Sequence, residues 1–193
     1  MRILVLFAHP VETSFQAALY RTVCDELKGA GHEVDALDLY AENFDPRLTR
    51  EERMDYHDLS KNQTNVAAYV ERVQAAEAMV IVTPVWNFGY PAILKGFFDR
   101  VFLPGVSFEM VAGKVKPKLK NIRKLAVVTT YGGSFWRAFL VGDPPRRIAK
   151  RFLRATFSLA TPVAYLAHYD MNRSTDASRT AFLGKVAHRM AHF

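Results

Sequence analysis

The feature of this chain that most constrains its fold is a set of short, wholly apolar runs separated by segments with helical spacing. Residues 3–8, 78–82 and 125–128 contain no polar side chain. Such runs are typical of strands in a parallel sheet covered by helices on both faces, because a strand with one wet face alternates polar and apolar residues. The sequence therefore predicts an α/β fold with a buried central sheet.

Strand and helix patterns alternate along the whole chain. The predicted strands are residues 2–7, 33–39, 78–83, 124–130 and 162–166. The predicted helices are residues 14–29, 66–76, 92–102, 144–157 and 176–192, the last with Ser174 or Thr175 as its N-cap. The polar segment 40–64 is expected to form a partly helical excursion. This order predicts one domain over residues 1–193, a three-layer α/β/α, doubly wound, five-stranded parallel sheet.

Charge is unevenly distributed between the two halves of the chain. Residues 1–113 carry 10 basic and 16 acidic side chains, whereas residues 114–193 carry 16 basic and 3 acidic ones. The basic half favours an anionic partner such as a phosphorylated dinucleotide, an acidic lipid surface or nucleic acid, although a solvated face needs no partner. Nucleic acid is disfavoured because the aromatic residues follow core-like patterns instead of alternating with the basic ones.

Composition excludes several other classes of protein. Half of the residues are hydrophobic, so the chain is not disordered, and no apolar run approaches the ~20 residues of a membrane span. The apolar start is too short for a signal peptide, so we expect a cytoplasmic protein. The single cysteine, Cys24, lies in a helical pattern and is expected to be buried. The histidines lack zinc-site spacing, so no metal site is predicted.

A loop rich in aromatic residues follows the strand at 78–83. Trp86 and Phe88 flank the amide of Asn87, between Pro84 and Pro91. In open α/β sheets, ligands bind at the carboxyl ends of the strands. Flat apolar faces beside an amide suit a planar ring with polar edges, such as a flavin isoalloxazine. An equally open interpretation is that these aromatic rings cap the core.

Two further loops leave neighbouring strands at the same edge. In the first, His9, Thr13, Ser14 and Gln16 surround a helix N-terminus, where free N–H groups favour a phosphate; alternatively, Ser14 or Thr13 simply caps the helix. In the other, residues 129–134, two glycines let the backbone approach a flat ligand, or form a plain turn. Neither loop has the glycine pattern of a Rossmann site or a P-loop. Their convergence on one crevice favours a shared ligand.

The three loops and the helix after the second one resemble the flavodoxin-like NAD(P)H quinone reductases. The matching segments are residues 8–10 with 13–15, 84–96 with 99–102, and 129–130 with 132–133. Residues 86–88 and 104–108 also resemble the related FMN-dependent azoreductases. The resemblance covers most of the chain in order and implies a flavodoxin-like fold.

The resemblance also implies which residues bind the flavin. His9, Ser14, Phe15 and Gln16 match the phosphate and ribityl loop, to which Thr13 belongs. Pro84, Val85, Trp86, Asn87 and Phe88 match the segment that lines the isoalloxazine. Thr129, Thr130, Gly132 and Gly133 match the loop at the pyrimidine edge, which also contains Tyr131. We expect FMN, with FAD as the alternative.

The family's activity implies a chemical role for the third loop. Members pass hydride from NAD(P)H to the flavin and then two electrons to a quinone, so a ping-pong mechanism with a quinone, azo or nitro acceptor is expected. N–H groups near Gly132 and Gly133 are expected to stabilise charge on the reduced ring. Animal quinone reductases follow this loop with a tyrosine and a histidine that residues 134–143 lack. Arg137 is expected to supply positive charge there and to favour NADPH over NADH.

The family also suggests partners and alternatives. Members are usually homodimers with the flavin at the interface, and the helix at 92–102 has a wider apolar surface than one sheet face needs, so part of it is expected to contact a second copy. One alternative function is a flavodoxin-type electron carrier. Another is a regulatory subunit of a membrane transporter, which would dock through the cationic segment 114–124 at a peripheral membrane contact.

Overall fold

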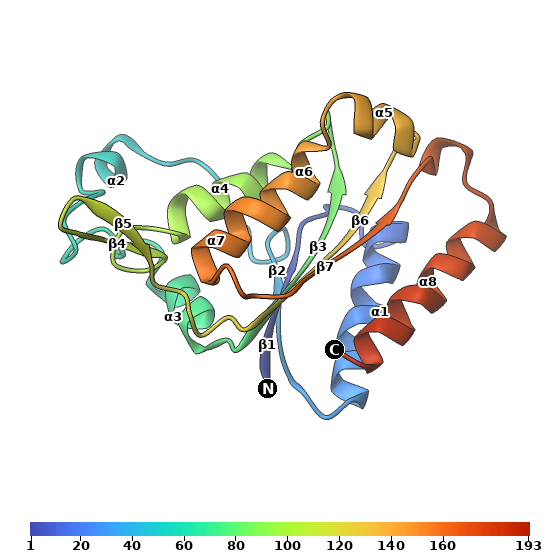
Figure 1. Ribbon diagram of the computed structural model, residues 1–193, viewed down its shortest axis with the longest axis horizontal. Coiled ribbons are helices and arrows are strands. Elements are labelled where there is room, and N and C mark those ends of the chain that lie inside the picture. The colour runs from blue at the N-terminus through green and yellow to red at the C-terminus, as the bar shows by residue number, and fades with distance from the viewer.

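A five-stranded parallel sheet forms the middle layer of the molecule in the computed structural model, which describes residues 1–193 (Figure 1). The strands are β1 (Arg2–Phe7), β2 (Glu33–Asp38), β3 (Ala78–Val85), β6 (Lys124–Tyr131) and β7 (Val163–His168). Their order is β2-β1-β3-β6-β7, and every pairing is parallel. The predicted doubly wound sheet is confirmed.

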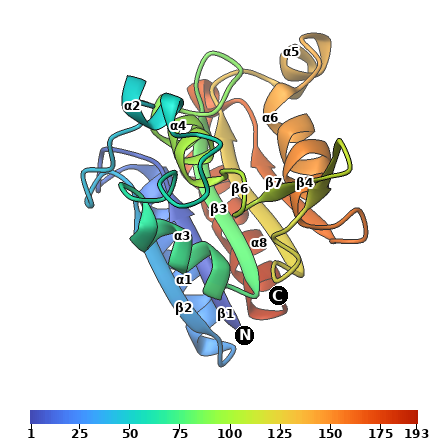
Figure 2. The ribbon, with the colours of Figure 1, turned by 90° about the vertical axis from the view of Figure 1, so that its left-hand side faces the viewer.

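Helices cover both faces of this sheet, as the apolar strands require (Figures 1 and 2). On one face lie α1 (Phe15–Gly29) and α8 (Asp176–Ala191). On the other lie α3 (Ala67–Ala75), α4 (Ala92–Val101), and a continuous helical segment made of α6 (Pro144–Arg147), the π-helical η1 (Ile148–Leu153) and α7 (Arg154–Phe157). Ser14 and Thr175 cap α1 and α8 as predicted. Cys24 is buried in α1, and burial raises the pKa of its thiol to about 11.

β3 is longer than the sequence predicted because it continues through Pro84. β1 pairs with β3 only as far as Val82, whereas β6 remains alongside, with Thr130 opposite Pro84. A proline lacks an N–H group and is tolerated where one neighbouring strand has ended. The aromatic loop therefore starts at Trp86, directly from the strand.

Several short elements were not predicted from the sequence. They are the 3₁₀ turn η2 (Met171–Arg173), helix α5 (Phe135–Leu140) and a hairpin of β4 (Phe108–Val111) and β5 (Lys114–Pro117). The hairpin turns at Ala112 and Gly113, both with positive φ. This is the geometry of a two-residue type I′ turn, but Ala-Gly is a weaker signal than Asn-Gly. α2 (Arg50–Met54) is the helical part of the expected excursion.

The apolar surface of α4 is already covered by the chain itself, which contradicts our reason for expecting a dimer contact there. Its side chains Ile93, Leu94, Phe97, Phe98, Val101 and Phe102 are all buried. The excursion crosses the helix at Gly96, where a Cβ atom would lie 2.3 Å from the carbonyl oxygen of Pro46. Arg100 of α4 also forms a buried ion pair with Glu52 of α2. None of the helices is long and apolar enough to cross a bilayer.

Candidate functional site

The carboxyl ends of β1, β3 and β6 lie side by side, so the three predicted loops leave the same edge of the sheet (Figure 1). The ring of His9 in the first loop lies 5.9 Å from the ring of Trp86 in the second. The first loop also meets β6, because the Thr130 hydroxyl donates a hydrogen bond to the Gln16 side chain. The predicted convergence is therefore present in the fold.

The aromatic loop is a tight turn that holds its rings in solvent. Trp86 and Gly89 exchange two backbone hydrogen bonds of 3.0 and 2.9 Å, and the residues between them, Asn87 and Phe88, have φ of 49° and 56°. Positive φ at both positions defines a type I′ turn. Trp86 is 42% exposed and Phe88 40%. The rings therefore do not cap the core and remain available for stacking.

His9 is held in one neutral tautomer. The backbone N–H of Val11 donates to His9 Nδ1 at 3.1 Å, so this nitrogen carries no proton. Burial lowers the pKa of the imidazole below its usual value, which keeps the ring neutral at pH 7. Its Nε2–H is consequently a hydrogen-bond donor beside the indole of Trp86.

The start of α1 retains the features of an anion site although Ser14 caps it. The Ser14 hydroxyl accepts a hydrogen bond from the N–H of Ala17 at 3.1 Å. The N–H groups of Phe15 and Gln16, in the first turn, have no partner within the helix. Thr13 is exposed next to them. Capping and anion binding are therefore compatible here.

The side chain of Gln16 is held within the fold. Its side chain is buried between α1 and the sheet, where Nε2–H donates to the carbonyl oxygen of Val128 at 3.2 Å and Oε1 accepts from Thr130. Helical geometry turns position 16 toward the sheet, so both ends of this amide are already hydrogen-bonded, and the expected phosphate contact through it stays a prediction. The residue also ties the first loop to β6.

Tyr131 is likewise not a loop residue. It is the last residue of β6 and is buried, and its hydroxyl donates to Asp143 Oδ1 at 2.6 Å and accepts from the Tyr165 hydroxyl at 2.5 Å. Arg146 completes this cluster by donating to Asp143 Oδ2 at 2.8 Å and to the Tyr169 hydroxyl at 2.7 Å. Burial, the neighbouring Tyr165 and the bonds it makes raise the pKa of Tyr131. No sequence spacing indicated this cluster, and the expectation that Tyr131 contacts a flavin stays a prediction.

The two glycines of the third loop are fixed through their carbonyl groups and leave their N–H groups free. The carbonyl of Gly133 accepts from Asp170 N–H at 2.8 Å, and that of Gly132 from Asn172 N–H at 3.3 Å. Neither glycine N–H donates within the chain. Arg137 lies directly beside Gly133, with its Cδ 3.6 Å from the position a Gly133 Cβ would take. Two donors and one cation thus sit together at the edge, as predicted.

The remaining predicted residues lie in the strands below the loops. Pro84 and Thr129 are buried in β3 and β6, and Val85 is half-buried at the strand end. The Thr129 hydroxyl is buried without a hydrogen-bond partner. These residues form the floor beneath the aromatic turn and the glycines.

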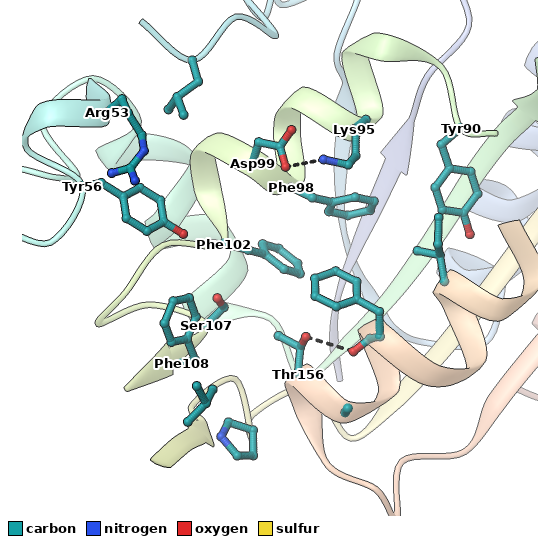
Figure 3. A pocket seen from close by; sticks show the side chains of 16 residues that line it. Arg53, Tyr56, Tyr90, Lys95, Phe98, Asp99, Phe102, Ser107, Phe108 and Thr156 are labelled. Atoms are coloured by element: carbon teal, nitrogen blue, oxygen red, sulfur yellow. Dashed lines mark hydrogen bonds and ion pairs between the residues drawn. The ribbon is translucent and has the colours of Figure 1, made fainter. Parts of the chain in front are cut away.

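A hollow of about 950 Å³ begins next to the aromatic turn and extends along α4 (Figure 3). Tyr90, which follows the turn, lines one end, and its hydroxyl donates to the carbonyl oxygen of Pro145. The walls come from α4, the hairpin, the segment 148–156 and the segment 48–56 around α2. The apolar and aromatic lining residues include Phe98, Phe102, Phe108, Ile148 and Phe152. Lys95 and Asp99 form an ion pair at its rim. The sequence did not indicate this hollow, because the hairpin that forms one of its walls was not predicted.

Comparison with known proteins places this geometry in a family. The model of a family described as having a flavodoxin-like fold matches residues 1–187. NAD(P)H dehydrogenase (quinone) 1 of Rattus norvegicus is 32% identical over 149 residues, which are 69% of this chain and 54% of the relative. The FMN-dependent NADH:quinone oxidoreductase of Lachnoclostridium phytofermentans is 33% identical over 126 residues, 63% of this chain and 59% of the relative.

A solved structure matches the whole chain. The crystal structure of Smu.1420 from Streptococcus mutans UA159 aligns over 100% of both chains with a TM-score of 0.87 and 30% sequence identity. By contrast, the chain spans a little over half the length of the two curated relatives above. Since the family model covers nearly the whole sequence and the sheet has the expected strand order, the protein belongs to the family with the flavodoxin-like fold.

Proposed function

We propose that the protein is a flavin-dependent NAD(P)H oxidoreductase that reduces a quinone or a similar acceptor. The observation that carries this proposal is the group at the carboxyl edge of the sheet: the exposed Trp86 turn, the neutral His9 beside it and the free N–H groups of Gly132 and Gly133. A flat ring with one apolar face and polar edges uses all of these features. The names of the relatives, a quinone dehydrogenase and an FMN-dependent NADH:quinone oxidoreductase, support the same assignment.

The residues present fit a flavin mononucleotide. The free N–H groups at the start of α1, with Thr13 and the cap residue Ser14, would hold its phosphate. Trp86 and Phe88 would cover the ring. When bound, the flavin supplies hydride and two-electron transfer, while the protein supplies position and electrostatics. FMN is preferred over FAD because the residues that fit end at the phosphate.

The chain's own groups would favour the reduced state of such a ring. Free N–H donors at Gly132 and Gly133 stabilise negative charge at the edge they face, and Arg137 adds a positive charge nearby. The neutral His9 donates a hydrogen bond without adding a charge. The 950 Å³ hollow beside Tyr90 offers an apolar space for an acceptor next to the turn.

We also propose that the protein is a cytoplasmic homodimer. The support is no longer the apolar surface of α4, which the chain buries, but the open hollow between α4, the hairpin and the segment 148–156. Its lining is mostly hydrophobic and includes six aromatic residues, which are enriched on surfaces that contact another protein. A second copy packed over its opening would enclose the hollow next to the aromatic turn and leave its interior for an acceptor.

Flavin binding is tested with the purified protein and both FMN and FAD. A flavin at a hundredfold excess over its Kd adds about 2.7 kcal/mol of stability. For a chain of this size, that raises the melting temperature by about 5 to 10 °C. Trp86→Ala should weaken FMN binding by at least about tenfold, since it removes the stacking face. Leu159→Ala, an exposed truncation at the end of α7, should have no effect.

The reaction is tested by anaerobic bleaching of the bound flavin with NADPH, followed by reoxidation with a quinone or an azo dye. An electron carrier would bind flavin without being bleached by NADPH. If neither FMN nor FAD stabilises the protein, the proposal that it binds a flavin is wrong. Light scattering that shows a monomer with flavin bound would contradict the homodimer alone.

A further inference from the structure

Helix α5 exposes an unusual amount of apolar surface. We define the α5 patch as Phe135, Trp136, Phe139, Leu140 and Val141. Leu140 is 81% exposed and Trp136 69%. The ring of Phe139 lies 6.2 Å from each of the rings of Phe135 and Trp136, so the aromatic side chains form one continuous surface. A patch of this kind on a folded protein marks an interaction surface.

Exposed positive charge, without exposed negative charge, lies on α5 and on the helical segment that follows it. Exposed basic residues on α5 and on the segment 144–157 are Arg137, Arg147, Lys150, Arg151 and Arg154. The Arg147 guanidinium lies 3.3 Å from the position a Gly142 Cβ would take, so it reaches the end of the patch. The only acidic residue between positions 132 and 169 is Asp143, which is buried.

Neighbouring elements do not add free acidic groups to this surface. Asp143 is paired with Arg146, and Asp170, whose N–H contacts the third loop, is paired with Arg173. Asp143 also fixes the orientation of the patch, because it joins the end of α5 to the start of α6 with a positive φ of 46°. In Figure 2 α5 stands above α6, and in Figure 1 it lies above and to the right of it. The patch and the basic segment that begins at α6 are therefore neighbours, and Arg147 joins them.

We propose that the α5 patch docks onto an anionic lipid surface. Exposed aromatic and aliphatic side chains insert between lipid head groups, and tryptophan is favoured at that depth. Arginine and lysine on the neighbouring segment meet the lipid phosphates. A second copy of the chain is a poorer partner, since a twofold contact through the patch would bring two sets of unpaired cations together. Nucleic acid would leave the exposed leucine and valine uncovered.

This surface lies at the sheet edge that carries the candidate site. Docking would turn the loop after β6 toward the bilayer, from which a lipid-dissolved acceptor could enter; this consequence rests on the proposed function, whereas docking itself does not. The two are distinguishable because lipid binding is measured without flavin or NADPH.

The test is co-sedimentation of the full chain with vesicles of phosphatidylcholine alone and of phosphatidylcholine mixed with phosphatidylglycerol. We expect binding to the mixed vesicles only, reversed by high salt, with a blue shift of tryptophan emission. Phe139→Ser/Leu140→Ser should weaken binding by more than about tenfold, since it removes two apolar side chains that would insert into the lipid. Separately, Arg147→Glu/Lys150→Glu should also weaken binding by more than about tenfold, since each basic residue near the surface contributes roughly fivefold.

Matched controls make the result specific to the patch. Met54→Ser removes an equally exposed apolar side chain from α2, and Arg189→Glu reverses a charge on α8. Both should bind vesicles like the unchanged protein, and thermal melts show that all variants are folded. The proposal is overturned if the mixed vesicles are not bound, or if the controls lose binding as much as the patch variants. It is also overturned if the Phe139→Ser/Leu140→Ser variant changes a dimer into a monomer while the unchanged protein ignores lipid.

Discussion

Two apolar helices of this protein, α4 and α5, have opposite relations to solvent. α4 carries two phenylalanines and three branched aliphatic residues, yet they are buried, and a segment that lies some fifty residues earlier in the chain crosses the helix at Gly96. α5 is richer still in aromatic residues and remains exposed. The comparison teaches that apolar composition identifies a helix that needs a partner, whereas long-range topology decides whether the partner is the same chain.

The sharpest test of this comparison removes one phenylalanine from each helix. Phe97 of α4 is fully buried among other aromatic rings, so Phe97→Ala should cost about 3 to 5 kcal/mol of unfolding free energy. Phe139 of α5 is 60% exposed, so Phe139→Ala should change that free energy by no more than about 0.5 kcal/mol. Urea unfolding measures both. If the two variants lost similar amounts of unfolding free energy, α5 would have to be buried against another molecule in solution.

The second test examines how closely the excursion packs on α4. In an open helix, replacing glycine with alanine stabilises by about 0.5 to 1 kcal/mol. At Gly96 the added carbon would lie 2.3 Å from a backbone oxygen of Pro46, so Gly96→Ala should instead destabilise by about 3 kcal/mol. No atom lies within 4 Å of the position that a Cβ on Gly184 of α8 would take. Gly184→Ala is therefore the matched control, and it should raise the unfolding free energy. A stabilising Gly96→Ala would show that the excursion does not cross α4 as described.

The third test concerns the ion pair between Glu52 and Arg100, which links α2 in this covering segment to α4. Burial raises the pKa of Glu52, but hydrogen bonds from Arg100 and from the N–H of Thr49 outweigh it, so the pKa is lowered below its ordinary 4.5. A lowered pKa in the folded state means that the stabilisation is present above pH 4.5 and is lost as the pH falls further. Glu52→Gln leaves Arg100 unpaired at a nearly buried position and should cost about 2 to 3 kcal/mol at pH 7.

The pH dependence separates this pair from the other acidic groups. The difference in unfolding free energy between the unchanged protein and Glu52→Gln should shrink as the pH is lowered from 5 toward 3. Denaturant unfolding at several pH values measures it. A difference that stays constant across this range would rule out the ion pair as its source.

The contrast between α4 and α5 also explains how much could be predicted from the sequence. The strands and long helices followed from periodicity, because continuous apolar runs and amphipathic spacing are local signals. The aromatic turn was located because it directly follows one of these apolar runs. The hydrogen bonds of Gln16 and Tyr131 could not be predicted, because their partners, Val128 and Asp143, are set by packing between layers. α5 and the hairpin were missed because each is too short for a periodic pattern.

The smallest effect we expect comes from Arg137, the charge that α5 carries beside the third loop. It forms no ion pair within the chain and lies against Gly133, so its guanidinium is free to meet the 2′-phosphate of NADPH. A partly shielded contact of this kind contributes about 1 to 3 kcal/mol. That corresponds to a preference for NADPH over NADH of roughly 5- to 150-fold in kcat/KM. Arg137→Ala should remove most of this preference, high salt should reduce it in the unchanged protein, and Arg189→Ala on α8 should leave it intact. Equal use of both donors by the unchanged protein would refute the preference, and an unchanged ratio in Arg137→Ala would assign it to another of the basic residues near α5.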